Sequence, residues 1–222
     1  MDHGEKYTGD VTVGGPAAVR ELPRLRITKV AVGPYDNNAY LLRCTVTGDT
    51  LLIDAAAEPD RLLEARGDGL LLSVVTTHQH PDHWQALEAV VGVTGPTVIA
   101  HPLDAPGLPI PVTETVEDGD VIEFGEAQVS VIHLHGHTPG SIALLYDPGR
   151  QEPHLFTGDS LFPGGPGNTH GNPRDFTSLM NDLESKIFGR LPDTTWVYPG
   201  HGKDTTLGTE RPHLGEWRER GW

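Results

Sequence analysis

The most informative part of this sequence is a run of ten residues, Val74-Val75-Thr76-Thr77-His78-Gln79-His80-Pro81-Asp82-His83. Its first half is apolar and β-branched, which is typical of a buried strand. In an extended segment residues i and i+2 point the same way, so His78 and His80 can offer imidazole nitrogens to one cation. Pro81 favours a turn, after which Asp82 and His83 are aimed differently and can bind a second cation. The run therefore predicts a site for two metal ions.

Three later motifs carry further candidate ligands in a fixed order. His137 lies in His-Gly-His-Thr-Pro-Gly-Ser (135–141), Asp159 in Leu-Phe-Thr-Gly-Asp-Ser-Leu-Phe (155–162) and His201 in Tyr-Pro-Gly-His-Gly (198–202). Together with the first motif, this order resembles that of the metallo-β-lactamase-fold hydrolases. The resemblance covers about residues 25–211. It implies an α/β fold, an αββα sandwich of two mixed sheets flanked by helices, with the metal site in loops at one edge.

The resemblance also implies how the ligands divide between two divalent ions. His78, His80 and His137 would hold one ion, Asp82, His83 and His201 the other, and Asp159 would bridge them. Asp82 and Asp159 are then the protein's catalytic residues, and a metal-bound hydroxide is the nucleophile that attacks a carbonyl carbon. The donors are nitrogen and oxygen only, which suits zinc but also iron or manganese.

The segment 203–211, Lys-Asp-Thr-Thr-Leu-Gly-Thr-Glu-Arg, resembles the ending of short glyoxalase II-like (hydroxyacylglutathione hydrolase-like) proteins. This implies hydrolysis of a hydroxyacyl-thiol thioester. Full-length glyoxalase II enzymes carry a further helical domain that contacts glutathione, and we expect no such domain here. The resemblance therefore supports the reaction class more firmly than the identity of the thiol carrier.

Other functions stay open at this level. A persulfide dioxygenase uses a similar fold with a single iron, and iron content with thiol-dependent oxygen uptake would reveal it. Lactone or lactam hydrolysis is a variant of the same chemistry. The non-catalytic alternative is a metal-binding domain, for which tight metal binding without turnover would be the evidence.

Loops next to the ligand motifs are the expected sites of substrate contact. Five residues in them are candidates: Tyr35, Phe162, Asn168, His170 and Lys203. His133, His135 and His137 follow one another at intervals of two residues, and we expect His133 and His135 to support the site or the structure rather than to bind metal.

Composition and charge exclude several classes of protein. The chain has 222 residues and a formal net charge of −15, which argues against nucleic acid as a partner because phosphate binding needs basic surface. No apolar run approaches the ~20 residues of a membrane helix, and the N-terminus has no signal-peptide pattern. Cys44 is the single cysteine, so no intrachain disulfide forms. We expect a cytoplasmic monomer or homodimer that acts on a small-molecule thioester.

The domain organisation is predicted as a polar N-terminal extension, residues 1–20, and one domain, residues 21–222. Strands are expected at 25–32, 39–46, 51–54, 70–77, 97–100 and 196–198, with hairpin strands within 121–145. Helices are expected at 58–65, 82–91 and 172–189, the last with Asn172 as its N-cap residue.

Overall fold

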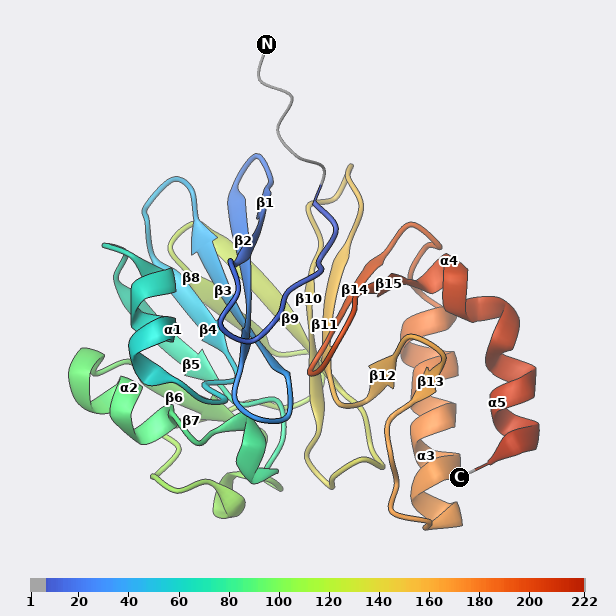
Figure 1. Ribbon diagram of the computed structural model, residues 1–222. Coiled ribbons are helices and arrows are strands. Elements are labelled where there is room, and N and C mark those ends of the chain that lie inside the picture. The colour runs from blue at the N-terminus through green and yellow to red at the C-terminus, as the bar shows by residue number, and fades with distance from the viewer. Residues whose placement is uncertain (1–6, 222) are drawn as a thin grey trace.

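Two mixed β-sheets face each other in the computed structural model, which describes residues 7–221 (Figure 1). Within these residues the first sheet consists, in spatial order, of β1 (Ala18–Glu21), β2 (Leu25–Val32), β3 (Asn37–Cys44), β4 (Thr50–Ile53), β5 (Leu71–Val75), β6 (Thr97–Ala100) and β7 (Glu114–Thr115). The second consists of β15 (Thr205–Thr206), β14 (Trp196–Pro199), β11 (His154–Gly158), β10 (Ile142–Tyr146), β9 (Ala127–His133) and β8 (Val121–Phe124). A separate small hairpin is formed by β12 (Leu161–Phe162) and β13 (Gly165–Pro166).

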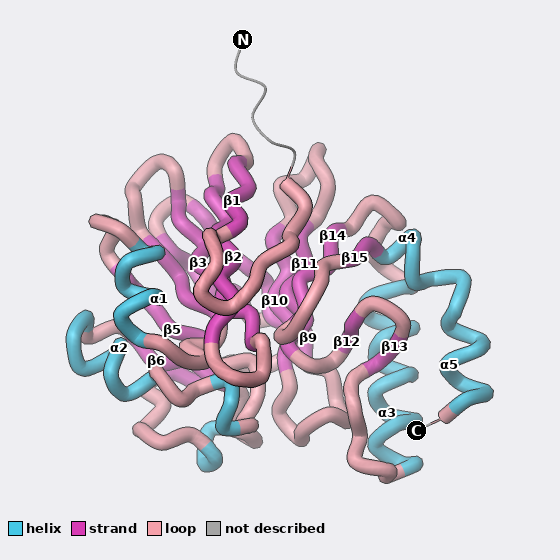
Figure 2. Tube along the Cα trace, in the orientation of Figure 1, coloured by secondary structure: helices cyan, strands magenta, loops and turns pink. Residues whose placement is uncertain are grey.

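Helices cover the outer face of each sheet, as the tube in Figure 2 shows. The first sheet carries α1 (Pro59–Arg66) and α2 (Leu87–Thr94). The second carries α3 (Pro173–Asp182), a π-helical continuation (Leu183–Phe188), α4 (Leu207–Glu210) and α5 (Leu214–Arg220). The expected αββα sandwich is therefore confirmed.

Three apolar layers hold the sandwich together. The central layer lies between the sheets, where Phe156 stacks on Tyr198 at 4.6 Å between ring centroids and meets the edge of Tyr40. The two outer layers join each sheet to its helices, with Leu87 and Val90 of α2 on one side and Leu179 and Met180 of α3 on the other. Full burial of one such side chain stabilises the fold by roughly 1.5–3 kcal/mol.

The helix predicted at 82–91 is wrong in its first half. A 3₁₀ turn, Pro81–His83, ends at Trp84, and α2 begins only at Leu87. Trp84 leaves the helical conformation (φ −142°), and its indole Nε1 donates to the carbonyl of Gln79 at 2.8 Å. The break separates the metal motif from the helix.

The helix predicted at 172–189 is confirmed in position but changes type. Asn172 caps it as expected, because its side chain accepts a hydrogen bond from the backbone N–H of Arg174 at 3.0 Å. After Asp182 the backbone continues as a π-helix to Phe188.

The described part of the N-terminal extension, residues 7–20, belongs to the folded domain. Strand β1 crosses the predicted boundary between residues 20 and 21 and pairs with β2. The ring of Tyr7 packs edge-on against Trp196 at 5.9 Å. The buried Lys29 ammonium donates to the carbonyl of Gly9 at 2.9 Å. Long-range contacts therefore attach this polar segment to the domain, although its sequence has no apolar pattern.

Two smaller expectations concern the cysteine and the membrane. Cys44, the single cysteine, is fully buried at the end of β3. Among the described residues, no helix combines the length and the apolar character needed to cross a bilayer.

Candidate metal centre

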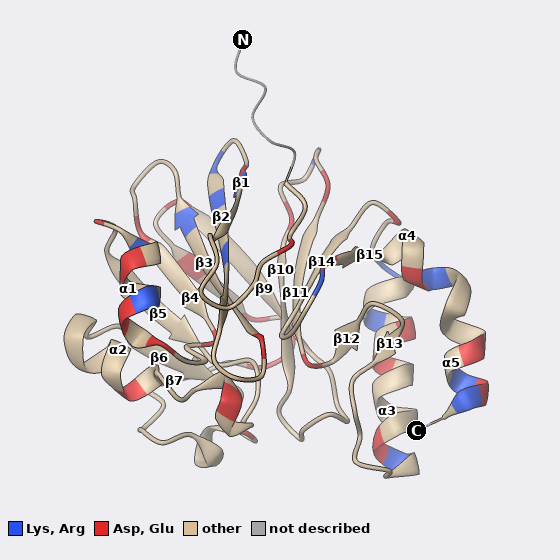
Figure 3. Ribbon diagram, viewed as in Figure 1, with Lys and Arg blue, Asp and Glu red and all other residues tan. Residues whose placement is uncertain are grey.

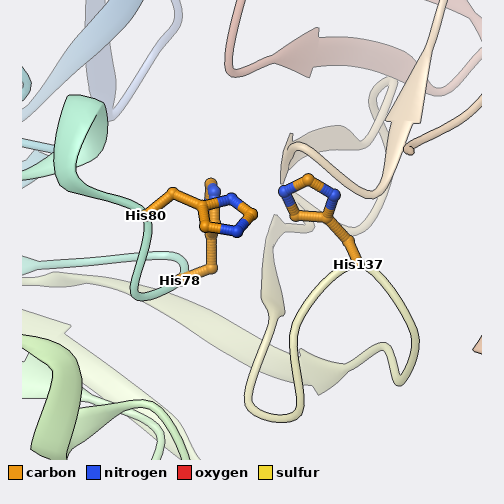
Figure 4. Close-up of side chains that lie close together, drawn as sticks. All are labelled: His78, His80 and His137. Carbon is orange, nitrogen blue, oxygen red and sulfur yellow. The ribbon is translucent and has the colours of Figure 1, made fainter. Parts of the chain in front are cut away.

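The candidate ligands lie where strands of both sheets end at one edge of the sandwich. His78 and His80 follow β5, and His137 lies between β9 and β10. Asp159 follows β11, and His201 follows β14, which pairs in parallel with β11. Figure 4 shows the imidazoles of His78 and His80 on one loop facing that of His137 on another. The fold thus brings together residues that are far apart in the sequence.

These side chains form two sets, which a third group of His78, His83 and Asp159 connects. In each set the possible ligand atoms lie within 4.8 Å of one another: His78, His80 and His137 in the first, and Asp82, His83 and His201 in the second. Asp159 lies between the sets, with its Oδ2 3.8 Å from His137 Nε2 and 3.4 Å from His201 Nε2. Its Oδ1 is 3.4 Å from His83 Nε2. Both sets are thus within reach of the Asp159 carboxylate, and its bridging role stays a prediction.

Unpartnered buried atoms at the centre fit metal ions. His78 Nε2, His137 Nε2 and Asp159 Oδ1 are buried and have no hydrogen-bond partner among the described residues. A buried polar atom without a partner costs about 1–3 kcal/mol, so a cation that binds all three would remove a substantial penalty. The nitrogen and oxygen donors match zinc, iron or manganese.

In the first set, the lowered pKa values of His78 and His137 leave a ring nitrogen of each unprotonated and available to a cation. Burial lowers the pKa of His78 well below its usual value and lowers that of His137 to about 4. Both imidazoles are therefore neutral at pH 7. A neutral imidazole has the lone pair that a metal requires.

In the second set, nearby carboxylates keep the imidazoles of His83 and His201 protonated. A bound metal ion would replace those protons. Burial opposes protonation, yet Asp54 and Asp159 raise the pKa of His83 to about 10. Asp159 and Asp82 likewise raise the pKa of His201 to about 10 against the effect of burial. In return, the hydrogen bond with His201 lowers the pKa of Asp82. The same negative charge would stabilise a divalent ion.

Hydrogen bonds on the far side of the rings orient four of the histidines. The Nδ1 atoms of these rings each have one partner: Thr77 Oγ1 for His78 (3.1 Å), Asp54 Oδ2 for His83 (2.8 Å), the Asn168 carbonyl for His137 (2.7 Å) and the Tyr35 carbonyl for His201 (2.8 Å). Because a carbonyl or carboxylate accepts from Nδ1–H, Nε2 is left to face the centre.

Asp54 is a functional residue that the sequence analysis missed. Its buried carboxylate accepts from the backbone N–H and the hydroxyl of Thr77, both at 2.7 Å, in addition to the ring of His83. Its backbone is left-handed (φ 56°), a conformation that non-glycine residues rarely adopt. An aspartate directly after the apolar strand 51–53 was the available signal.

Two further polar residues organise the loops. Asn37, buried at the start of β3, donates from Nδ2 to Asp82 Oδ2 at 2.9 Å. Asp104 accepts from the backbone N–H groups of Gln79 (3.0 Å) and Gly140 (2.7 Å), and so joins the two loops that carry the first ligand set. Neither position belongs to a recognisable motif.

The predicted substrate contacts fall into two groups. Tyr35 and Asn168 reach the site through their main-chain carbonyls, and the Tyr35 side chain is 65% exposed. His170 lies closer to the site, with its ring centroid 5.6 Å from that of His80. Phe162 lies 6.4 Å from the ring of His201. 

Lys203 lies at a different hollow. It forms an ion pair with Asp10 at 3.6 Å and lines a cavity of about 520 Å³ together with Asp36 and Asn38. That cavity contains none of the candidate ligands.

His133 and His135 do not join either ligand set. The ring centroids of His133 and His135 lie 3.8 Å apart with the rings tilted by 41°, and those of His133 and His101 lie 4.0 Å apart with a tilt of 33°. His135 Nδ1 bonds to Asp182 Oδ2 at 2.6 Å. The supporting role that we expected of both residues stays a prediction.

A cavity of about 690 Å³ opens beside the first ligand set. His80, His135, His137 and His170 are among the residues that line it. The first turns of α3 form one wall. Its volume is suited to a small organic substrate.

Comparison with known proteins identifies the family. The model of the metallo-beta-lactamase superfamily matches residues 32–201, and the chain belongs to that superfamily. A hydroxyacylglutathione hydrolase of Polaromonas sp. is 38% identical over 169 residues, which is 75% of this chain. The matched region spans only 62% of that relative's length.

Two solved structures agree with this result. TTHA1623, solved in a di-iron-bound form, is 35% identical with a TM-score of 0.70, over 82% of this chain and 96% of its own. ETHE1 from Myxococcus xanthus is 30% identical with a TM-score of 0.73, over 85% of this chain and 82% of its own.

Proposed function

We propose that this protein is a dinuclear-metal hydrolase that cleaves a hydroxyacyl thioester. The observation that carries the proposal is the position of Asp159 between two ligand sets, next to a cavity of about 690 Å³. The names of relatives such as the Polaromonas hydroxyacylglutathione hydrolase support the thioester as substrate class.

The protein's own groups prepare this centre. Two bound divalent ions would supply a water of lowered pKa and a positive charge opposite the substrate carbonyl oxygen. Asp159 links the two ligand sets, and Asp54 holds the ring of His83 in place. Asn37 orients the carboxylate of Asp82. Because these groups are already positioned by hydrogen bonds, little reorganisation is needed when a substrate binds.

The substrate would enter through the cavity beside His80 and His137. From that side its carbonyl group reaches the ligand atoms of the first set, and the thiol portion lies against the side chains from α3. The ring of His170, held in a left-handed backbone conformation (φ 54°), lies next to both His80 and His137. We assign it a contact with the thioester.

The native metal decides between this reaction and its main alternative. TTHA1623 carries two iron ions, which supports iron as a candidate beside zinc and manganese. With a single iron, persulfide oxidation is the competing reaction, and it consumes oxygen whereas hydrolysis does not. Metal content and oxygen uptake therefore separate the two.

The test uses protein stripped of metal and reconstituted with zinc, iron(II) or manganese. Hydrolysis of S-lactoylglutathione and of S-lactoyl-N-acetylcysteamine is measured for the wild type, for Asp159→Ala and for Glu123→Ala, a substitution of an exposed acid on β8. We expect turnover that Glu123→Ala retains and that Asp159→Ala reduces by more than about 100-fold. Hydrolysis of neither ester with any metal would contradict the proposal.

A further inference from the structure

The cavity beside the metal centre is lined by imidazoles as its basic groups, namely those of His80, His135, His137 and His170. None of the described residues that line it is Lys or Arg, and its charged group apart from imidazoles is the carboxylate of Asp175. Its remaining polar groups are amides and hydroxyls, among them those of Asn172, Thr169 and Ser178. Recognition of a carboxylate normally uses Arg, Lys or free backbone N–H groups.

The first turn of α3 does not supply the missing positive charge. Helix N-termini attract anions through their free N–H groups and the helix dipole. Here the Asn172 side chain accepts from the N–H of Arg174 at 3.0 Å, and its Nδ2 donates to Asp175 Oδ2 at 2.6 Å. Asp175, in the first turn, offsets the dipole.

Of the nearby basic residues, Arg174 in the first turn of α3 is exposed and is not among the residues that line the cavity, and two lysines are paired elsewhere. Lys186 donates to the His133 carbonyl at 2.6 Å and lies 3.4 Å from Asp118 and 3.6 Å from Asp182. Lys203 belongs to the other cavity and pairs with Asp10. Figure 3 shows other Lys and Arg residues, in blue, on parts of β1–β3 and on the outer helices. With a net charge of −15, the field of the whole protein also repels anions.

We propose that this cavity selects thioesters whose thiol carrier has no net negative charge, and that Asp175 is the residue that sets this preference. The inference rests on the proposed function and names the class of its substrate. A carrier rich in hydroxyl and amide groups, or one with an ammonium group, finds partners in Asn172, Ser178 and Asp175. The two carboxylates of glutathione find none there, so its ester is a poor substrate.

The test measures binding separately from turnover. Three thioethers of equal length carry a 2-hydroxypropyl group on sulfur and end in a trimethylammonium, an acetamide or a carboxylate group. Their affinities for the zinc-loaded protein are measured by titration calorimetry. Wild type, Asp175→Asn, Asp175→Lys and the control Asp60→Asn are compared, because Asp60 is an exposed first-turn acid of α1.

We expect the trimethylammonium ligand to bind about tenfold more tightly than the carboxylate ligand, with the acetamide ligand between them. Asp175→Asn should reduce the tenfold ratio to about twofold, Asp175→Lys should invert it, and Asp60→Asn should leave it unchanged. Tighter binding of the carboxylate ligand to the wild type would overturn the inference. A ratio that Asp175→Asn and Asp175→Lys both leave unchanged would also overturn it.

Turnover of the matching lactoyl thioesters distinguishes this inference from the proposed function. If the expected order of affinities is found but no ester is hydrolysed, the charge preference is supported and the thioesterase proposal fails. If the carboxylate ester is hydrolysed with the highest kcat/KM, the thioesterase proposal is supported and the charge preference fails.

Discussion

Asp54 Oδ2 accepts a hydrogen bond from His83 Nδ1 at 2.8 Å, and both side chains are buried. The contact joins the end of β4 to the metal motif after β5. It holds the ring of His83 with Nε2 towards His201, 3.2 Å away. The orientation of one candidate ligand thus depends on a residue outside every ligand motif.

Asp54→Asn should lower the affinity for the second metal ion by about 10–100-fold. Asparagine tolerates the left-handed backbone at this position, so the variant removes the negative charge without adding backbone strain. Competition with a chromogenic chelator measures the affinity, and Glu123→Gln serves as the control. Wild-type affinity in Asp54→Asn would show that the carboxylate does not support the ligand.

Gly200→Ala should prevent binding of a full complement of two metal ions. A methyl group at Gly200 would lie 2.2 Å from Asp159 Oδ1 and 2.8 Å from His83 Cε1, so both side chains would have to move. Metal per protein after reconstitution is measured by mass spectrometry. Gly215→Ala, where added bulk meets nothing within 4 Å, is the matched control. A ratio of two in Gly200→Ala would contradict the predicted crowding.

Lys29→Met should destabilise the fold by about 3–5 kcal/mol. Lys29 and Asp204 are almost fully buried and lie 2.6 Å apart, so removal of the ammonium leaves a buried carboxylate without its counter-charge. Urea unfolding of the metal-free protein measures the loss of stability. The double variant Lys29→Met/Asp204→Leu should be more stable than Lys29→Met alone, and additive losses would argue against a coupled pair.

Stability should fall as the pH is lowered from about 6.5 to about 4, in part because of His154. Burial, and then the nearby Arg20, lower the pKa of His154 to about 4. Since the unfolded chain binds the proton near pH 6.5 and the folded chain does not, folding is opposed below pH 6.5, by up to about 3 kcal/mol near pH 4.

Comparison with His154→Gln isolates this contribution. The variant cannot titrate at position 154, and its amide can still accept from the hydroxyl of Tyr198, which lies 3.0 Å from His154 Nδ1. Urea unfolding of both metal-free proteins between pH 7 and pH 4.5 should show a steeper loss in the wild type. Parallel curves would exclude His154 as a source of the acid sensitivity.

Local patterns in the sequence were sufficient for much of the fold. Strands β2 and β6 occupy residues 25–32 and 97–100 as predicted, because their apolar β-branched runs are bounded by turn residues. The helix at 82–91 was misplaced because an apolar stripe does not show where the first turn begins. At that boundary the Trp84 indole donates to the carbonyl of Gln79, five residues earlier in the chain.

By itself, the sequence determined the class of fold and predicted the seven candidate ligands, because each candidate lies in a short motif that resembles those of a known family. Only the tertiary structure decided which groups hold those ligands. Asp54, Asn37 and Asp104 act through hydrogen bonds to residues 23–45 positions away, which no local pattern encodes. The charge of the cavity was also decided in three dimensions, since its walls come from separate loops and from the first turns of α3.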